Sequence, residues 1–189
     1  MIKNLIVLGT VLAIFTSCSN SGSKTEPAVE KAIPAEVVIT NDFENALGVM
    51  PSWYNENTVL QMTEPQAHSG IYAGITNDTL PYGYTYKQTL KNIDPRLPKI
   101  ATVNGWVYTT VANPDFSIVC GINENNQTYN WKAYPLKDTL SETGKWIEFT
   151  ATFYFDDKPL KPEHEISLYA LNNSKHAIYT DDLKITFSY

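Results

Sequence analysis

The sequence predicts an all-β protein, an antiparallel β-sandwich of the jelly-roll type, on three observations. The 189 residues include 12 tyrosines and 4 tryptophans, and aromatic and β-branched residues are enriched in strands. Ten short apolar runs follow one another along the chain, with clusters of Pro, Gly, Asn and Asp between them. No segment shows a helical apolar stripe longer than one turn. Strands at this spacing are typical of sandwiches and jelly rolls.

The predicted strands cover residues 36–40, 58–62, 71–76, 84–90, 100–111, 116–122, 129–134, 146–155, 165–171 and 177–187. The strand over 146–155 shows the alternation most clearly. Because successive side chains of a strand point to opposite faces, one face of this strand is expected to enter the core through Ile147, Phe149, Ala151, Phe153 and Phe155.

Residues 1–17 are expected to be a signal peptide and not part of the fold. Lys3 precedes an apolar run over residues 5–15, which is too short to span a bilayer but has the length of a signal-peptide core. The sequence Thr16-Ser17-Cys18 that follows resembles the lipobox of bacterial lipoproteins. This resemblance implies cleavage before Cys18 and its acylation, so that the partner of Cys18 would be a lipid bilayer. The alternative is an ordinary secretory signal in which Cys18 occurs by chance.

Residues 18–35 are predicted to form a flexible tether, because they are small, polar and Pro-containing and bury little apolar surface. A coil of this length would hold the domain roughly 20–25 Å from the lipid. Ser19 differs from the Asp that retains lipoproteins at the inner membrane of enteric bacteria, so the outer membrane of a Gram-negative bacterium is the expected location. Residues 36–189 are the length of one domain.

The charge and the cysteines bear on two further functional classes. The net charge of −6 and the lack of a Lys/Arg cluster argue against a nucleic-acid partner. If Cys18 is acylated, Cys120 has no disulfide partner. Cys120 shares a predicted strand face with Phe116 and Ile118, which indicates a small buried hydrophobe. A catalytic thiol would need a His or a positive charge nearby, and none is adjacent in the sequence.

Six short motifs follow one another along most of the predicted domain. They are Asp42-Phe43-Glu44, Trp53, His68-Ser69-Gly70-Ile71-Tyr72-Ala73, Val103-Asn104-Gly105-Trp106-Val107-Tyr108, Gly144-Lys145-Trp146 and Ile178-Tyr179-Thr180-Asp181-Asp182-Leu183-Lys184-Ile185. This succession resembles the galactose-binding-like jelly rolls, and among them the carbohydrate-binding modules that accompany bacterial glycanases. Residues 76–100 depart from the pattern, and such regions decide the choice of ligand in that family.

The resemblance implies a structural Ca²⁺ site with Glu44 and Asp181 as ligands. Asp181 is expected to share the core face of the last strand with Tyr179, Leu183, Ile185 and Phe187, where a charge is costly unless paired or metal-bound. Glu44 would lie nearby if the first and last strands are neighbours, and two carboxylates with backbone carbonyls of the Ser69-Gly70 turn suit Ca²⁺. In the alternative, Asp181 accepts N–H groups of a turn and Glu44 is solvated.

The resemblance also implies a non-catalytic protein that binds a polysaccharide or oligosaccharide on exposed aromatic rings. The candidate ligand-binding residues come from two aromatic clusters and are Trp131, Tyr134, Tyr84 and Tyr86. Tyr82, Tyr84 and Tyr86 are expected to share one strand face, where they would either bind a ligand or simply cover the sheet. The pair Trp53-Tyr54, in a loop rich in Asn and Glu, either binds as well or plugs the end of the sandwich.

Two other functions remain open from the sequence. The same aromatic face would suit a protein partner in the cell envelope, because Tyr and Trp are favoured interface residues. A glycan hydrolase would need a facing pair of carboxylates, and Glu148, Glu163 and Glu165 are candidates without a spacing that singles out a pair. The sequence has no His-Glu-x-x-His or Gly-x-Ser-x-Gly motif. We therefore expect a binding protein and not an enzyme.

Overall fold

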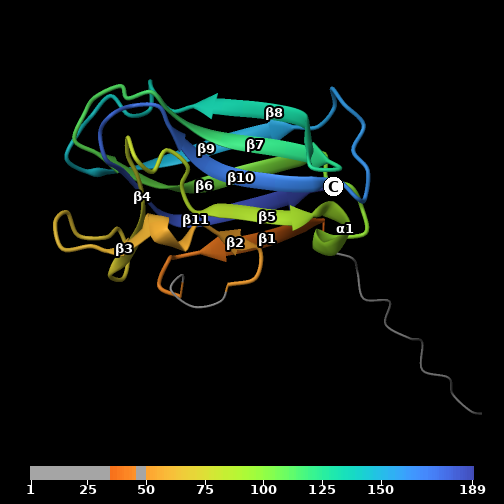
Figure 1. Ribbon diagram of the computed structural model, residues 1–189, viewed down its shortest axis with the longest axis horizontal. Helices are drawn as coiled ribbons and strands as arrows, with labels where there is room; N and C mark the ends of the chain where they lie inside the picture. The colour runs from red at the N-terminus through yellow and green to blue at the C-terminus, as the bar shows by residue number, and fades with distance from the viewer. Residues whose placement is uncertain (1–34, 46–49) are drawn as a thin grey trace, which may run out of the picture. The chain divides into compact units, whose positions relative to one another are not determined.

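The computed structural model describes residues 35–45 and 50–189, which form two antiparallel sheets (Figure 1). One contains β1 (Glu36–Asn41), β3 (Val59–Gln61), β4 (Tyr72–Thr76), β6 (Ile100–Thr109), β9 (Trp146–Tyr154) and β11 (Ile178–Ser188). The other contains β2 (Trp53–Tyr54), β5 (Thr85–Thr89), β7 (Phe116–Glu124), β8 (Gln127–Pro135) and β10 (Glu165–Asn172). The first, the six-stranded sheet, has the order β3-β4-β11-β6-β9, and β1 also pairs with β11. The second, the five-stranded sheet, has the order β2-β5-β10-β7-β8.

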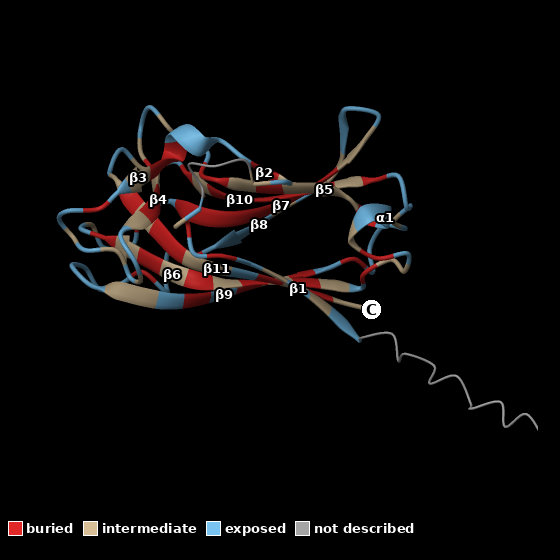
Figure 2. Cartoon of the chain, turned by 90° about the horizontal axis from the view of Figure 1, so that it is seen from below, coloured by how far each residue is buried: buried red, intermediate tan, exposed pale blue. Residues whose placement is uncertain are grey.

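The sheets lie face to face (Figure 2), and residues of both sheets form one buried hydrophobic cluster. In β6 the alternation is regular: Ala101, Val103 and Val107 are buried, whereas the residues between them are half-buried on the outer face. Large aromatic side chains such as Phe149 and Phe187 fill the same core. The predicted antiparallel β-sandwich is therefore confirmed, and burial of one face of each sheet is what stabilises it.

All ten predicted strands are present, and their ends agree with the prediction to within two residues. The predicted inward face of β9 is also correct, because Phe149, Ala151 and Phe153 are buried. Three short elements were not predicted: β2, the single-turn helix α1 (Leu90–Ile93) and the 3-10 turn η1 (Glu56–Thr58). Segments of two to four residues are too short to show a hydrophobic period.

The face of β11 changes at a β-bulge between Asp181 and Lys184. Before the bulge, Asp181 pairs with Trp106 on the outer face, and after it Ile185 pairs with the buried Val103. An extra residue turns the following side chains to the other face. The prediction that Tyr179, Asp181, Leu183, Ile185 and Phe187 share one face is therefore wrong. Ile185 and Phe187 lie in the core and Leu183 packs against it, whereas Tyr179 and Asp181 lie on the outer face.

The first and last strands of the sandwich, β1 and β11, pair along the length of β1, so the start of β1 lies beside the C-terminus. Glu36 at the start of β1 pairs with Ser188 near the C-terminus, and Figure 1 shows both ends beside α1. The predicted signal peptide, Cys18 and all but the last residue of the predicted tether lie outside the described residues, so they stay predictions. Within the described ranges, no helix is both long enough and apolar enough to cross a membrane.

Candidate functional site

Four aromatic side chains cross the outer face of the five-stranded sheet, and we call them the aromatic row. They are Tyr54 on β2, Tyr82 just before β5, Tyr169 on β10 and Trp131 on β8. Tyr54, Tyr82 and Trp131 are 50%, 55% and 50% exposed. Since neighbouring strands lie about 4.8 Å apart, the row extends roughly 20 Å from β2 to β8.

Three of the four rings of the row contact one another in succession. The indole Nε1 of Trp131 donates a hydrogen bond of 3.2 Å to the hydroxyl of Tyr169. The Tyr169 ring meets the Tyr82 ring edge-on, with centroids 5.9 Å apart. Beside Tyr82 lies a surface hollow of about 200 Å³ whose lining includes Asn55, Asn57 and Thr79. The row therefore combines fixed, exposed ring surface with amide and hydroxyl groups.

Small side chains form the floor between the rings. Ser117, Val119 and Gly121 on β7 and Ser167 on β10 are buried and alternate with core residues. A Cβ atom added at Gly121 would meet only the Cβ of Ser167, at 4.0 Å. Glycine weakens the interior of a strand and often marks a place where a ligand approaches the backbone. The floor thus lies lower than the rings on either side of it.

The charges on this face are paired. Lys87 on β5 and Glu165 on β10 form an ion pair of 2.9 Å, and both belong to the outward-facing set of their strands. The amide of Asn55 donates to the backbone oxygen of Gly83 at 3.2 Å and to the Thr85 hydroxyl at 3.3 Å. The face therefore carries polar groups beside the aromatic row, and the ion pair of Lys87 and Glu165 adds no net charge to it.

The structure separates the two predicted binding residues of β8. Trp131 pairs with Gly121 on the outer face, whereas Tyr134 pairs with Ile118, a core residue, and so lies on the other side of the strand. Because β8 is at the edge of its sheet, Tyr134 is still 39% exposed. The two rings belong to different surfaces of the protein.

Tyr84 and Tyr86 are buried, so the prediction that they lie on an exposed ligand-binding face is wrong. Each is only 3% exposed. Tyr84 stacks on Trp53 with centroids 5.2 Å apart, and Tyr86 packs edge-on against the same indole at 5.5 Å. Burial raises the pKa of both phenols. The chain bends at Tyr84 before β5 begins, so Tyr82 faces outward while the two tyrosines after it enter the core.

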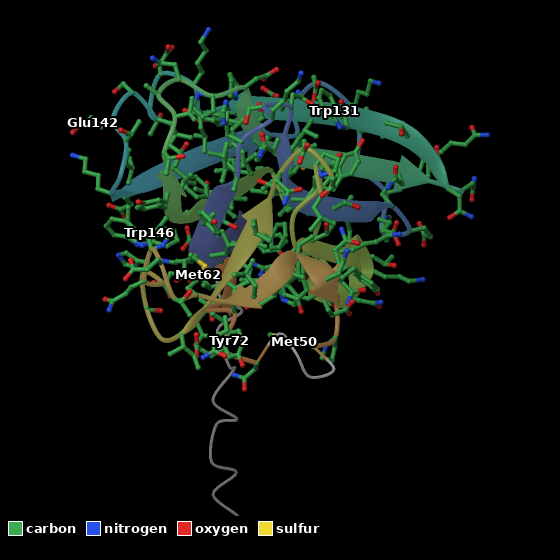
Figure 3. All side chains as sticks on the ribbon, turned by 60° about the vertical axis from the view of Figure 1, so that its left-hand side comes forward. Met50, Met62, Tyr72, Trp131, Glu142 and Trp146 are labelled. Atoms are coloured by element: carbon green, nitrogen blue, oxygen red, sulfur yellow. The ribbon has the colours of Figure 1, made fainter. Side chains whose placement is uncertain are left out.

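The outer face of the six-stranded sheet also carries aromatic residues, which we call the covered cluster. Its members are His68, Trp106, Tyr108, Trp146 and Tyr179. The His68 ring stacks on Trp106 with centroids 3.9 Å apart, and the indole of Trp146 donates to the backbone oxygen of Gln66 at 3.0 Å. These contacts fix the loop before β4 onto the sheet. Figure 3 shows Trp131 and Trp146 well apart on the molecule.

Glu44 and Asp181 both contact the turn that precedes β4. One oxygen of Glu44 accepts the backbone N–H groups of Ile71 and Tyr72, at 2.9 and 2.8 Å. Asp181 accepts the N–H groups of His68 and Ser69, at 2.9 and 3.2 Å. Its other oxygen accepts its neighbour's N–H at 2.7 Å. β1 and β11 are neighbours, as expected, and the two carboxylates accept N–H groups of the same turn at different residues.

These contacts match the alternative for Asp181, in which it satisfies N–H groups of a turn. Burial raises the pKa of the Asp181 carboxyl to about 6, although the backbone N–H groups of Ser69 and Asp182 act in the opposite direction. The ligand chemistry still suits Ca²⁺, because both side chains offer hard oxygens. Among the described residues, no group of three or more His, Cys, Asp or Glu side chains is arranged around one metal position. Calcium stays a prediction.

Other candidates are placed by the fold. Cys120 is 2% exposed, and burial raises the pKa of its thiol to about 12, so the interpretation as a small buried hydrophobe is confirmed. Glu148 pairs with Trp106 on the outer face of the six-stranded sheet, whereas Glu165 lies on the opposite face of the sandwich. These two carboxylates therefore do not face each other across one substrate.

The sequence pointed to Trp131 and left Tyr82 and Tyr54 open as either binding or structural residues, but it gave no indication of Tyr169. Tyr54 follows Trp53 in a two-residue strand, and Tyr169 lies within a strand that is otherwise mostly buried. Both alternate with core residues, Trp53 and Leu168. That alternation was the available signal, but it needs the inward residue of each strand to be known first.

Comparison by sequence found no matching family model and no matching curated protein, so it assigns no family. Comparison by structure found similar folds. The CBM22-1 xylan-binding domain of Xyn10C from Paenibacillus barcinonensis has a TM-score of 0.54 and 18% identity, over 83% of this chain and 98% of that domain. The CBM22-1-CBM22-2 tandem domain of the same protein has a TM-score of 0.54 and 17% identity, over 84% and 47%.

A third similar structure is a Stig cyclase, Fisc from Fischerella sp. TAU, with a TM-score of 0.42 and 10% identity, over 86% of this chain and 92% of that one. The two CBM22 structures define the fold of this chain as a β-sandwich of the kind found in carbohydrate-binding modules. At these sequence identities, structural similarity shows the fold but not the ligand, which has to be inferred from the site itself.

Proposed function

We propose that this protein is a non-catalytic carbohydrate-binding protein whose binding site is the aromatic row. The observation that supports it best is the exposure of Trp131, Tyr82 and Tyr54 around a floor of small side chains. A sugar ring has apolar C–H faces and hydroxyl edges, so a flat ring beside amides and hydroxyls suits both parts of it. The similarity to a xylan-binding domain over its whole length adds support.

The proposed ligand is a neutral polysaccharide or an oligosaccharide segment of one. Lys87 and Glu165 on this face form an ion pair and neutralise each other. Lys87 is therefore not left unpaired to attract an acidic glycan. The row runs across the strands from β2 to β8, and both of these are edge strands. An extended chain therefore fits across the sheet, and xylan is the first polymer to test.

We also propose that the protein is held at the outer membrane by Cys18, with residues 18–35 as the tether and 36–189 as the binding domain. The tether would join the sandwich at the start of β1. Labelling with a radioactive fatty acid should mark the wild-type protein and not Cys18→Ala. Labelling of both proteins would show that Cys18 is not the site.

Affinity electrophoresis through gels that contain xylan, barley β-glucan or glucomannan tests the binding site. We expect Trp131→Ala to weaken retardation, because truncation of a central aromatic residue costs about 2 kcal/mol or more and so raises the Kd for binding at the aromatic row about 30-fold. The melting temperature should stay the same, because Trp131 is half exposed. Val38→Ala, at an exposed apolar residue of β1, is the matched control and should bind normally.

Two results would overturn the proposal. If Trp131→Ala is retarded as strongly as the wild-type protein, the aromatic row is not the binding site. If no gel retards the wild-type protein or any variant, and the protein captures an envelope protein only when Trp131 is present, the result would favour the alternative of a protein-interaction module on the same face.

A further inference from the structure

A second aromatic-lined groove lies at the open edge of the sandwich, where β8 and β9 are the edge strands of their two sheets. It is a hollow of about 560 Å³, and its lining includes Lys132 and Tyr134 from β8 and Thr152 and Tyr154 from β9. Tyr134 and Tyr154 are 39% and 56% exposed. A volume of this size lies within the range of ligand pockets, about 300–1,000 Å³.

The groove is distinct from the aromatic row because of the alternation in β8. Trp131 pairs with Gly121 on the outer face, and Lys132 and Tyr134 pair with Cys120 and Ile118 on the core side. Successive side chains of one strand therefore serve two surfaces. Trp131 is absent from the lining of the groove, and Tyr134 is absent from the aromatic row.

The lysine of the groove, Lys132, is paired with a carboxylate, whereas two other polar groups in the lining have no partner in the part of the chain that the structure describes. The ammonium of Lys132 donates to the carboxylate of Asp157 at 2.8 Å and also to the backbone oxygen of Tyr154. Within the described residues, the Thr152 hydroxyl and the Asp156 carboxylate in the lining take part in no hydrogen bond or ion pair with the protein. The hydroxyl can therefore donate a hydrogen bond to a ligand or accept one from it, and the carboxylate can accept one.

The edge is poorly suited to pairing with a peptide strand. Strand addition needs free backbone groups along an edge, but Lys132 occupies the oxygen of Tyr154 and Lys158 occupies that of Tyr129, at 2.9 Å. Such lysines are a common protection of sheet edges. Recognition through side chains, with rings and hydroxyl-bonding groups, fits what remains exposed.

The groove also extends beyond this hollow. Tyr154 and Asp156 line a second hollow of about 360 Å³, together with Leu97, Pro98 and Leu160. Tyr154 and Asp156 thus line both hollows, one with polar groups and one mainly apolar. An elongated ligand with apolar faces and hydroxyl edges fits this sequence of surfaces.

We infer that the groove between β8 and β9 is a second carbohydrate-binding site, which takes a neutral oligosaccharide on Tyr134 and Tyr154. It goes beyond the proposed function, because it is a separate site with its own residues. It would let one protein hold two segments of polysaccharide at once.

The test is isothermal titration of the full chain carrying Cys18→Ala with xylohexaose, cellohexaose and mannohexaose. We expect two hexasaccharides to bind each chain. The double variant Tyr134→Ala, Tyr154→Ala should bind one, Trp131→Ala should bind one, and the triple variant none. Val38→Ala is the control and should bind two, and circular dichroism should show the same melting temperature for all variants, because the replaced rings are exposed.

The outcomes separate this inference from the proposed function. One hexasaccharide per chain, lost with Trp131→Ala and unchanged in the double tyrosine variant, overturns the second site and supports the aromatic row. One hexasaccharide that is lost only in the double tyrosine variant supports the groove and overturns the aromatic row. Binding of no hexasaccharide to wild type overturns both.

Discussion

The outer faces of the two sheets are both aromatic, but they differ in what covers them. On the six-stranded sheet, the loop before β4 lies on the covered cluster: His68 stacks on Trp106 and the Trp146 indole donates to the backbone of Gln66. On the five-stranded sheet, Trp131 donates only to another side chain of the same row and is half exposed. A tryptophan whose N–H is used by a loop stabilises the fold, whereas one left on a bare sheet is available to a ligand.

This difference explains why aromatic content alone does not locate a site. Both faces contain Tyr and Trp at alternate strand positions. What distinguishes them is the loop of residues 62–71 and the two carboxylates, Glu44 and Asp181, which fix its last turn.

The largest expected effect is on the core tyrosines next to the aromatic row. Tyr86→Ala should lower the free energy of unfolding by about 3–5 kcal/mol, as for other large aromatic residues in cores. Tyr82→Ala should change it by less than about 0.5 kcal/mol, because Tyr82 is 55% exposed. Urea unfolding measures both. Equal values would contradict the opposite orientations of these two tyrosines.

A smaller effect is expected in the covered cluster. Trp106→Ala should cost about 2–3 kcal/mol, below the value for a fully buried ring, because Trp106 is half-buried beneath His68. Trp131→Ala should cost less than about 1 kcal/mol in the same urea experiment. If Trp131→Ala destabilises the protein as much as Trp106→Ala, both faces are structural and the distinction between them fails.

The next effect concerns the turn that covers the six-stranded sheet. If Ca²⁺ binds at Glu44 and Asp181, calcium at ten times its Kd adds about 1.4 kcal/mol, so a chelator should lower the melting temperature by roughly 3–6 °C. Asp181→Ala should remove this sensitivity. Glu163→Ala, an exposed carboxylate before β10, should keep it. A wild-type protein that melts at the same temperature with and without chelator has no such site.

The smallest effect on stability is expected at the floor of the aromatic row. Gly121→Val should change the free energy of unfolding by less than about 0.5 kcal/mol, because the added Cβ meets only Ser167. It should nevertheless weaken retardation by the polysaccharide, since it raises the floor between the rings. Gly105→Val is the contrast, because there a Cβ would lie 2.8 Å from Leu183 in the core. Normal retardation of Gly121→Val would place the ligand elsewhere.

Much of the fold was predictable because strand patterns are local. The alternation in β9 identified its buried face from nine residues, without knowledge of any neighbour. The same reasoning failed in β11, where one extra residue at the bulge reverses the face. It failed again before β5, where the bend at Tyr84 separates Tyr82 from Tyr86. A one-residue irregularity leaves almost no trace in a sequence but changes every later assignment.

The strands, the fold class and the burial of Cys120 could be predicted from the sequence, because each depends on the hydrophobicity of neighbouring residues. The exposure of the aromatic side chains could be assigned only from the three-dimensional arrangement of the strands and loops. Trp131 and Trp146 occupy similar alternating strands, yet one lies beside the small residues Gly121 and Ser167 and the other beneath a loop from elsewhere in the chain. Exposure depends on what packs against a strand from far away in the sequence, and periodicity carries no information about that partner.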